Sequence, residues 1–433
     1  MSCGVYGKAL PKGPRGSVCS RGRERGLPKM EIDAVRVLSK KFVIVVFIFT
    51  AMLIFVSQGT VRAAFFDLPA VGARASGTGG AMTGLANDTL SAVYYNPAAL
   101  PDVEGDNLVV GATAVRFRAR YKSPQGYDEK NNQIGVVPNA AFSSDRFKPI
   151  FFGIGMYGTL GVGFDYDADS DHNISHKFES NTGNMYLSPT IGYKLNDKIS
   201  VGMGFNITYC KIDMGMPTPS NDTLEIDADG FCFGVNLGVL YKPCEYLNLG
   251  LRWRSPMKAD LKGDADFSGV KDHVTAHMYW PHTLTFGIGL HITPKLTMLL
   301  DLEWIDYSDF SEKSHLDYNN LKFLDSPFLA GMRDAGRLHV GCEYLLNEKI
   351  ALRAGYLYNP WCAPVTQMSP LVTANTFHSL HIGLGWKIKN FTLDIAITRG
   401  WGSDKTVTYT ESGYPGIYET PCLAADMNLT YRF

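Results

Sequence analysis

Three pairs of residues in this chain have types and spacings that could support chemistry. They are His378–Ser379, His172 with His176, and His273 with His277. A hydrolase needs its nucleophile beside a base, but neighbouring residues on a strand point to opposite faces of the sheet. Two histidines four positions apart meet over one metal ion on a helix, whereas both histidine pairs fall in segments expected to be loops or loop ends. We therefore expect no enzyme activity, no metal site and no cofactor.

The cysteines also predict no metal centre. The chain has 8 of them, with no Cys-x-x-Cys motif and no spacing typical of metal ligands. Cys210 and Cys232 flank one predicted loop and could pair, although connectivity cannot be derived from sequence. The formal net charge is -1, so bulk charge favours neither a nucleic-acid partner nor a polybasic contact with a membrane surface.

One strongly apolar stretch, Phe42 to Val56, follows two lysines near the beginning of the chain. A basic flank, a short apolar run and then small residues are typical of a secretory signal peptide, and we place cleavage after Ala63. The run is short for a membrane-spanning helix. The basic segment before it, rich in Gly and Pro, predicts that Met30 is the true start. Residues 1–63 are therefore expected to be an extension plus the signal peptide of an exported protein.

The elements that must position any site are β-strands. From Thr283 to Ile292, Leu284 and every second residue after it are apolar, while the residues between them are Thr, Gly and His. The pattern repeats from Leu296 to Trp304, where Asp301 and Glu303 lie on the other face. Alternation with a period of two predicts strands with one apolar face and one mostly polar face.

The connections between these strands alternate in length. Short turns such as Thr293-Pro294-Lys295 follow some strands, and longer polar loops such as Asp165 to Asn181 follow others. This alternation is typical of an outer-membrane barrel, and the hairpins predict about fourteen antiparallel strands. A soluble β-sandwich would also alternate. Its solvated faces should carry more Lys and Glu than these faces, which are rich in Gly, Ser and Thr.

Aromatic residues favour the membrane interpretation as well. Trp253, Trp280, Trp304 and Trp401 fall near the loop ends of strands, where an aromatic girdle would lie. The final alternating strand ends on Phe433, which is typical of the signal that barrel-assembly machinery reads. We therefore expect an all-β, transmembrane antiparallel barrel that contacts outer-membrane lipid as a monomer.

The segment before the barrel carries motifs of a known family. Gly79-Gly80-Ala81 and Tyr95-Asn96-Pro97-Ala98 lie in a stretch of small residues. Together with the segments around Glu303-Trp304 and Arg333 to Arg337, they resemble long-chain fatty-acid and aromatic-hydrocarbon transporters of the FadL/TodX type, and the resemblance covers most of residues 64–433. It implies a hatch over residues 64–105, with Asn96, Pro97, Ala98, Gly79 and Gly80 as its site residues, and a barrel over residues 106–433.

The resemblance also implies a function. The protein would be an outer-membrane channel that takes up hydrophobic small molecules, either long-chain fatty acids or aromatic and alkyl hydrocarbons, by passive, ligand-gated diffusion. The hatch would shift when ligand arrives, and the solute could leave sideways. Phe65 and Phe66 would reach into the ligand pocket. Gly158, Gly161 and Gly163 would kink a strand and open the wall, or would form a plain bulge.

Several alternatives remain open. Leu240, Leu299 and Leu357 interrupt polar faces and could line an apolar pocket or pack against the hatch. The family often has an Asp-Arg pair where this chain has Thr376-Phe377, which favours a neutral hydrophobic substrate. The hatch could also be a filler that only blocks the pore. The rival functions are a general diffusion porin and a structural surface barrel.

Overall fold

The computed structural model describes residues 68–433, apart from 160–162, 173, 175, 219, 221, 373–375 and 412. The predicted signal peptide, its cleavage site and the predicted start at Met30 lie outside these residues, as do Phe65 and Phe66. In the part of the chain that is described, no helix combines the length and the apolar character needed to cross a membrane.

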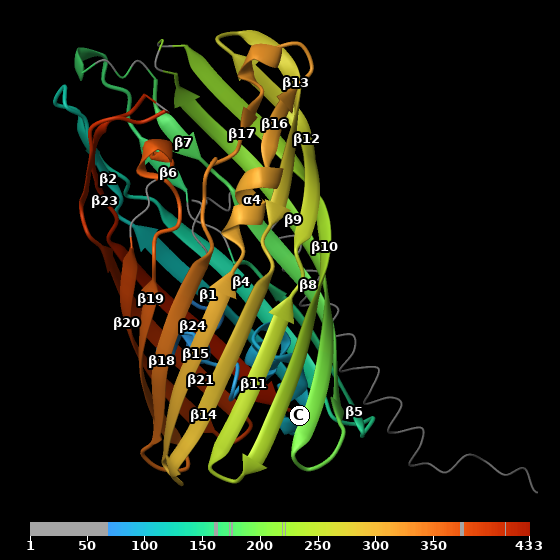
Figure 1. Cartoon of the computed structure of the whole chain (residues 1–433). Helices are drawn as coiled ribbons and strands as arrows, with labels where there is room; N and C mark the ends of the chain where they lie inside the picture. Colours follow the sequence, from blue (N-terminus) through green and yellow to red (C-terminus); the bar gives the residue numbers. More distant parts are fainter. Residues whose placement is uncertain are drawn as a thin grey trace, which may run out of the picture. The chain divides into compact units, whose positions relative to one another are not determined.

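Fourteen antiparallel passes close into one barrel (Figure 1). In chain order they are β1 (Asn107–Phe117), β4 (Ile134–Ser144), β5 (Ile150–Tyr157), β8 (Gly183–Lys194), β9 (Ile199–Pro217), β10 (Thr223–Cys244), β11 (Leu247–Arg254) with β12 (Met257–Phe267), β13 (Val270–Trp280) with β14 (Thr283–Thr293), β15 (Leu296–Ile305), β18 (Ala335–Leu345), β19 (Ile350–Asn359), β20 (Phe377–Ile388), β21 (Phe391–Gly402) and β24 (Cys422–Arg432). The ring closes because β1 pairs with both β4 and β24. The predicted all-β barrel is confirmed.

The two faces predicted for the strands are also confirmed. On β14, Leu284 and Phe286 point outward and are about two-fifths exposed, whereas Thr285 between them is buried inside. On β15, Leu302 is exposed and Asp301 is buried. An outer face of large apolar side chains would be costly in water but is compatible with lipid.

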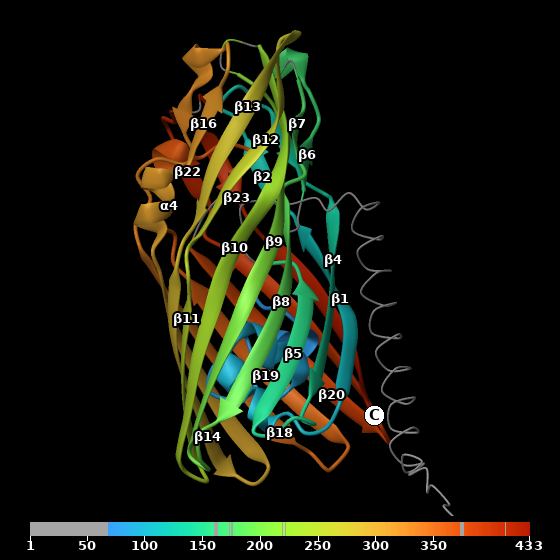
Figure 2. The ribbon, with the colours of Figure 1, turned by 90° about the vertical axis from the view of Figure 1, so that its right-hand side faces the viewer.

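Some strands extend further than the sequence predicted. β9 runs to Pro217 and β10 begins at Thr223, so most of the loop expected between them is strand. His273 and His277, also expected in a loop or at its end, lie on β13. Figure 2 shows β12 and β13 as a hairpin that continues past the ends of β11 and β14.

Shorter elements gather at the end of the barrel where this hairpin lies. They are β6 (Phe164–Tyr166), η2 (Ser170–His172), β7 (Phe178–Ser180), α4 (Tyr307–Lys313), β16 (His315–Tyr318), η3 (Lys322–Leu324), β17 (Ser326–Pro327) and η4 (Val365–Gln367), with a separate sheet in the order β22 (Lys405–Val407), β23 (Gly416–Glu419), β2 (Arg120–Lys122) and β3 (Asp128–Lys130). The predicted short turns connect β8 to β9, β10 to β11, β14 to β15, β18 to β19 and β20 to β21. They therefore lie together at the opposite end.

The N-terminal helices lie inside the ring of strands (Figures 1 and 2). α2 (Ala73–Gly77) contacts β19, β20, β21 and β24, whereas η1 (Pro97–Asp102) contacts β8, β9 and β10 on the other side of the barrel. α3 (Thr89–Tyr94) contacts β4 and β5. One continuous segment that touches strands all around the ring must fill the lumen, so we call residues 68–105 the hatch.

Glycines on the inner faces of the strands leave room for the hatch backbone. A Cβ atom at Gly250 would lie 2.0 Å from the carbonyl oxygen of Thr83, and one at Gly238 would lie 2.1 Å from Oδ1 of Asn96. Such distances are far below van der Waals contact, so any other residue would displace the hatch. The glycine-rich polar faces seen in the sequence are therefore explained by close packing against the hatch.

The barrel wall is interrupted where β5 ends. β5 stops at Tyr157 and β6 begins at Phe164, and the ladder between β4 and β5 ends at the pair Asn139–Tyr157. β4 continues beyond Asn139, but among the described residues that continuation pairs only with β1. Gly158 and Gly163 flank this break, and Gly161 lies outside the described residues. We call this interruption, at the described residues Gly158, Thr159 and Gly163, the wall break.

Candidate functional site

A mostly apolar cavity of about 130 Å³ lies next to the wall break. Its apolar lining comes from Met257, Leu261, Met278, Trp280, Ile305, Phe310, Leu329, Met332, Trp361 and Val372, and its polar lining includes Thr159, Thr182, Lys211, Arg254 and Tyr307. Trp280, which the sequence placed in an outer girdle, lines this cavity instead, whereas Trp304 is exposed on the outer face. A concave apolar site with a few polar groups suits a hydrophobic small molecule.

Arg254 brings a positive charge to the edge of this cavity. Its guanidinium lies 4.6 Å from the ring centroid of Tyr94, and Nη2 donates to the backbone carbonyl oxygen of Tyr94 at 3.4 Å. Its Nε is buried without a hydrogen-bond partner. The guanidinium therefore retains donor capacity that a ligand could use.

A second cavity of about 50 Å³ adjoins the first, because Arg254 and Thr283 line both. One wall comes from the hatch and includes Leu68, Gly80, Thr83 and Tyr95, and the other comes from the barrel and includes Arg252, Thr285, Asp301, Glu303, Arg337 and His339. The two cavities together lead from the apolar site to the surface of the hatch. The lining is mostly apolar in the first cavity and includes several charged side chains in the second.

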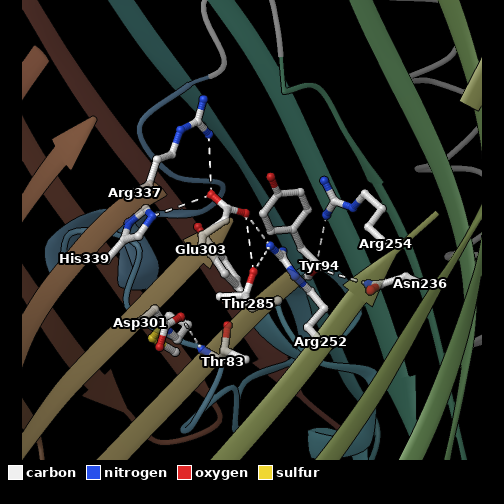
Figure 3. A network of polar contacts seen from close by, with 12 residues as sticks. Thr83, Tyr94, Asn236, Arg252, Arg254, Thr285, Asp301, Glu303, Arg337 and His339 are labelled. Carbon is white, nitrogen blue, oxygen red and sulfur yellow. Dashed lines mark hydrogen bonds and ion pairs between the residues drawn. The ribbon is translucent and has the colours of Figure 1, made fainter. Parts of the chain in front are cut away.

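Glu303 is the centre of the charged wall (Figure 3). Nη2 of Arg252 donates to its Oε1 at 2.6 Å, and Nη1 of Arg337 lies 3.5 Å from its Oε2. Nε2 of His339 lies 3.8 Å from the same oxygen, while Nδ1 of His339 lies 2.8 Å from the carbonyl oxygen of Gly79. A buried carboxylate is tolerated only when it is paired. The network satisfies Glu303 and connects the barrel wall to the hatch.

The Asn-Pro-Ala motif anchors the hatch to β10. Asn96 is fully buried, and its Nδ2 donates to the carbonyl oxygens of Thr83 at 2.8 Å and Val239 at 3.2 Å. Its Oδ1 accepts from the backbone N–H of Ala98 at 3.1 Å, which caps η1, and Pro97 occupies the first turn. Asparagine is suited to this position because its amide both donates and accepts, and proline needs no N–H partner at a helix start.

Two further polar contacts hold the hatch, and sequence reasoning did not identify them. Asp301 accepts the backbone N–H of Thr83 at 2.8 Å. Arg74 and Arg353 both pair with Glu343, at 2.9 and 2.6 Å. The signal in the sequence was the presence of charges on inward faces of strands. The partners could not be assigned, because Arg74 and Glu343 are separated by 269 positions.

The start of the described hatch closes against the wall break. The backbone N–H of Leu68 donates to the carbonyl oxygen of Thr159 at 2.7 Å. Thr159 lies within the wall break and lines the apolar cavity, whereas Leu68 lines the second cavity. Phe65 and Phe66 precede Leu68 directly but lie outside the described residues. The hydrogen bond between Leu68 and Thr159 therefore joins the hatch to the wall break. Each of its two residues also lines one of the two cavities.

The three leucines singled out in the sequence lie elsewhere. Leu240 and Leu299 are buried in the cluster that contains hatch residues such as Met82 and Leu100. Leu357 is buried between His339 and Ser379 of the neighbouring strands. None of the three lines either of the two cavities described above. Leu240 and Leu299 therefore pack with the hatch, one of the two alternatives that the sequence left open.

Ser379 does meet a histidine, but a different one from its neighbour His378. Its Oγ lies 2.8 Å from Nε2 of His381, and Nδ1 of His381 lies 2.9 Å from Oγ1 of Thr398. Residues two apart on a strand share a face, which is why His381 is the partner. All three side chains are almost completely buried and line neither cavity. The arrangement is accounted for by mutual hydrogen bonding.

Cys210 and Cys232 are close but not bonded. They lie on the paired strands β9 and β10, and their Sγ atoms are 3.7 Å apart. Both are buried and free in the structure. Cys210 also lines the apolar cavity.

The comparisons with known proteins agree with this geometry. The model of a family described as outer membrane protein transport protein (OMPP1/FadL/TodX) matches residues 53–433. Outer membrane protein P1 of Haemophilus influenzae is 24% identical over 417 residues, covering 81% of this chain and 88% of that protein. The long-chain fatty acid transport protein of Escherichia coli is 23% identical over 325 residues, covering 64% of this chain and 69% of that protein.

Solved structures show the same fold. The crystal structure of the Pseudomonas putida toluene transporter TodX superimposes with a TM-score of 0.75 at 16% identity, covering 85% of this chain and 99% of that chain. The Ralstonia pickettii toluene transporter TbuX gives a TM-score of 0.69 at 20% identity, covering 84% and 99%. Since the family match spans both hatch and barrel, the chain belongs to the OMPP1/FadL/TodX family of outer-membrane transport proteins and is a β-barrel of the outer membrane.

Proposed function

We infer that this barrel takes up hydrophobic small molecules across the outer membrane by passive, ligand-gated diffusion. The observation that carries the proposal is the place of Thr159, which lies in the wall break, lines the apolar cavity and accepts a hydrogen bond from the hatch at Leu68. A solute that enters the cavity would therefore touch the wall and the plug at the same point.

The proposed route follows the cavities. The solute binds in the apolar cavity, where Met278, Trp280 and Phe310 exclude water from it. Its arrival displaces the start of the hatch from Thr159, and the wall break then offers a sideways exit. A hydrophobic solute gains from this exit because the membrane outside is apolar, while the charged wall around Glu303 disfavours the path through the lumen.

The substrate class follows from the lining. Apolar side chains suit aromatic or alkyl hydrocarbons, and Arg254 offers a partner for the carboxylate of a long-chain fatty acid. Phe377, at the position that favoured a neutral substrate, packs against the cluster that contains Leu68. The residue that could bind a substrate carboxylate is Arg254 at the end of β11. We propose that both hydrophobic carboxylates and neutral hydrocarbons are carried.

A matched pair of methionine substitutions tests this function. Met278→Trp would fill the apolar cavity, whereas Met298→Trp places the same bulk on the outer face, where Met298 is exposed. Each variant is expressed in a Gram-negative strain that lacks endogenous transporters of this kind, and uptake of labelled toluene and oleate is measured. We expect uptake to fall several-fold in Met278→Trp and to stay at the wild-type level in Met298→Trp. Wild-type uptake by a correctly assembled Met278→Trp barrel would contradict the proposal.

A general diffusion porin makes the opposite prediction for ion flow. An open lumen conducts ions in a planar bilayer, but here the hatch contacts strands on both sides of the lumen. We expect no large ohmic conductance from the wild-type barrel. Large, steady single-channel steps would favour the porin.

A further inference from the structure

We propose that the outer face of the β12–β13 hairpin and β16 binds a divalent transition-metal ion of the Zn²⁺ type, through His277, His315 and Asp317. His277 lies on β13 directly opposite His315 on β16 in the antiparallel ladder. Asp317 lies two residues after His315, so its side chain is on the same face. Three donors from two strands thus converge on one point of the surface.

The distances between these donors match the dimensions of a metal site. Nε2 of His277 lies 3.5 Å from Oδ2 of Asp317, and Nε2 of His315 lies 3.7 Å from the same oxygen. All three ligand atoms lie within 4.8 Å of one another. With metal–ligand bonds of about 2.0–2.1 Å, a tetrahedral ion separates its ligand atoms by roughly 3.3 Å. The two distances to Asp317 exceed this separation by only a few tenths of an ångström, and side-chain rotations that bring the two imidazole nitrogens together would complete the site.

A second carboxylate orients one of the histidines. Asp260 on β12 is the cross-strand neighbour of His277, and its Oδ1 lies 2.7 Å from Nδ1 of His277. This contact leaves Nε2 of His277 free to face Asp317 and His315. A carboxylate on the far nitrogen of a metal-binding imidazole is the usual supporting interaction, because it fixes the ring and raises its basicity. The arrangement is thus a ligand set with one supporting partner already in place.

The site is open to solvent and separate from the ligand cavity. The side chains of His277, His315 and Asp317 are 32%, 46% and 45% exposed. The next residue along β13, Met278, points the other way into the apolar cavity. Charged residues such as Lys262 occupy the outer face of β12, so this part of the hairpin lies beyond the lipid-facing belt. A dissolved ion can therefore reach the site, and water can occupy the fourth position.

The donor set selects the class of ion. Two imidazoles and one carboxylate suit Zn²⁺, Ni²⁺ or Cu²⁺, whereas Ca²⁺ and Mg²⁺ prefer oxygen ligands in larger number. The ladder between β13 and β16 spans only residues 274–277 with 315–318. A bound ion would add a cross-link between these strands. Among the residues that the structure describes, this is the one group of three or more donors with such convergence.

Titration of the tag-free, full-length barrel in detergent with ZnCl₂ tests the site. Calorimetry should show one equivalent bound by the wild type, and Co²⁺ in place of Zn²⁺ should give the visible absorption of a tetrahedral site. His277→Ala and His315→Ala should each lose this equivalent, and Asp260→Asn should bind roughly 10–100-fold more weakly. His273→Ala is the matched control, because His273 is exposed on the same face of β13 and pairs with Asp264 outside the proposed site.

The zinc titrations of the wild type and the variants distinguish the proposed site from its absence. Loss of the zinc equivalent in His277→Ala and His315→Ala, with wild-type binding in His273→Ala, supports the site. Absence of zinc binding by the wild type, equal weakening by His273→Ala, or displacement of zinc by millimolar CaCl₂ would overturn it. All variants lie on an exposed face, and heat-dependent mobility on gels confirms that each barrel is folded. Should His277→Ala fail this check, the Co²⁺ spectra of wild type and His315→Ala alone decide the outcome.

Discussion

The backbone N–H of Leu68 donates a hydrogen bond to the carbonyl oxygen of Thr159, over 2.7 Å. This bond joins the start of the hatch to the one place where the ladder from β4 is interrupted among the described residues. It is a single backbone contact, worth about 0.5–1.5 kcal/mol. A bound solute can therefore break it at little cost, which makes it a suitable point of control.

Locking this contact should stop transport. The hydrogen bond holds the two residues side by side, and a disulfide between them needs Cα atoms about 4.4–6.8 Å apart. We expect Leu68→Cys with Thr159→Cys to form that bond and to reduce uptake of labelled toluene several-fold, because the hatch can no longer leave the wall break. Reduction with dithiothreitol should restore uptake. The single-cysteine variants are the controls, and wild-type uptake by the oxidised double variant would show that the hatch does not move here.

Replacing Arg254 should change selectivity rather than overall transport. Hydrogen bonds to a charged group contribute about 1.5–3 kcal/mol. We expect Arg254→Met to weaken binding of a long-chain carboxylate by roughly tenfold or more and to leave a neutral alkylbenzene nearly unaffected. Arg254→Lys, which keeps the charge, should retain part of the carboxylate binding. Displacement of a fluorescent fatty acid from purified barrels measures both ligands, and an equal loss for the two would mean that Arg254 only supports the packing of Tyr94.

Adding one methyl group at Gly238 should loosen the hatch. Its Cβ would lie 2.1 Å from Oδ1 of Asn96, so the Asn-Pro-Ala anchor must shift. Overpacking of this kind costs about 1–3 kcal/mol. We expect Gly238→Ala to show brief ion-conducting openings in planar bilayers and a lower melting temperature. Gly336→Ala is the matched control, because a Cβ there meets nothing within 4 Å. Identical traces from both variants would argue against close packing at Gly238.

Acid should release η3 from β13. Burial alone would raise the pKa of Asp272, but the backbone N–H groups of Leu321 and Asn320 donate to it and lower its pKa to about 2. A lowered pKa means that this contribution to stability is complete above the ordinary carboxyl pKa and is lost as the pH falls towards 2. A fluorophore at Lys322→Cys should lose anisotropy over that interval.

The variant Asp272→Asn separates this effect from other acid transitions. It should show low anisotropy already at neutral pH, with little further change down to pH 2, because the ionised acceptor is missing. An acid transition in Asp272→Asn as large as that of the wild type would assign the release of η3 to another carboxyl group.

Much of the barrel followed from local pattern. Leu284 and Phe286 alternate with Thr285, and this period of two specified both the strand and its outward face. The short turns marked the hairpins in the same way, whereas the plug was expected only from the family resemblance that the Asn-Pro-Ala motif helps to carry. Local sequence was less informative in the β12–β13 hairpin, where the outward residues of the strands are polar. For this reason His273 and His277 were expected in a loop or at its end.

What the sequence by itself determined is the repeating unit: a strand with an apolar and a polar face, a short turn, and a glycine-rich segment ahead of them. Only the tertiary structure decided which inward charge pairs with which, that Leu68 meets Thr159, and that His277 meets His315 rather than His273. The physical reason is that alternation depends on neighbours along one strand, whereas these contacts depend on the register and closure of the whole ring. Closure joins residues that no local pattern relates.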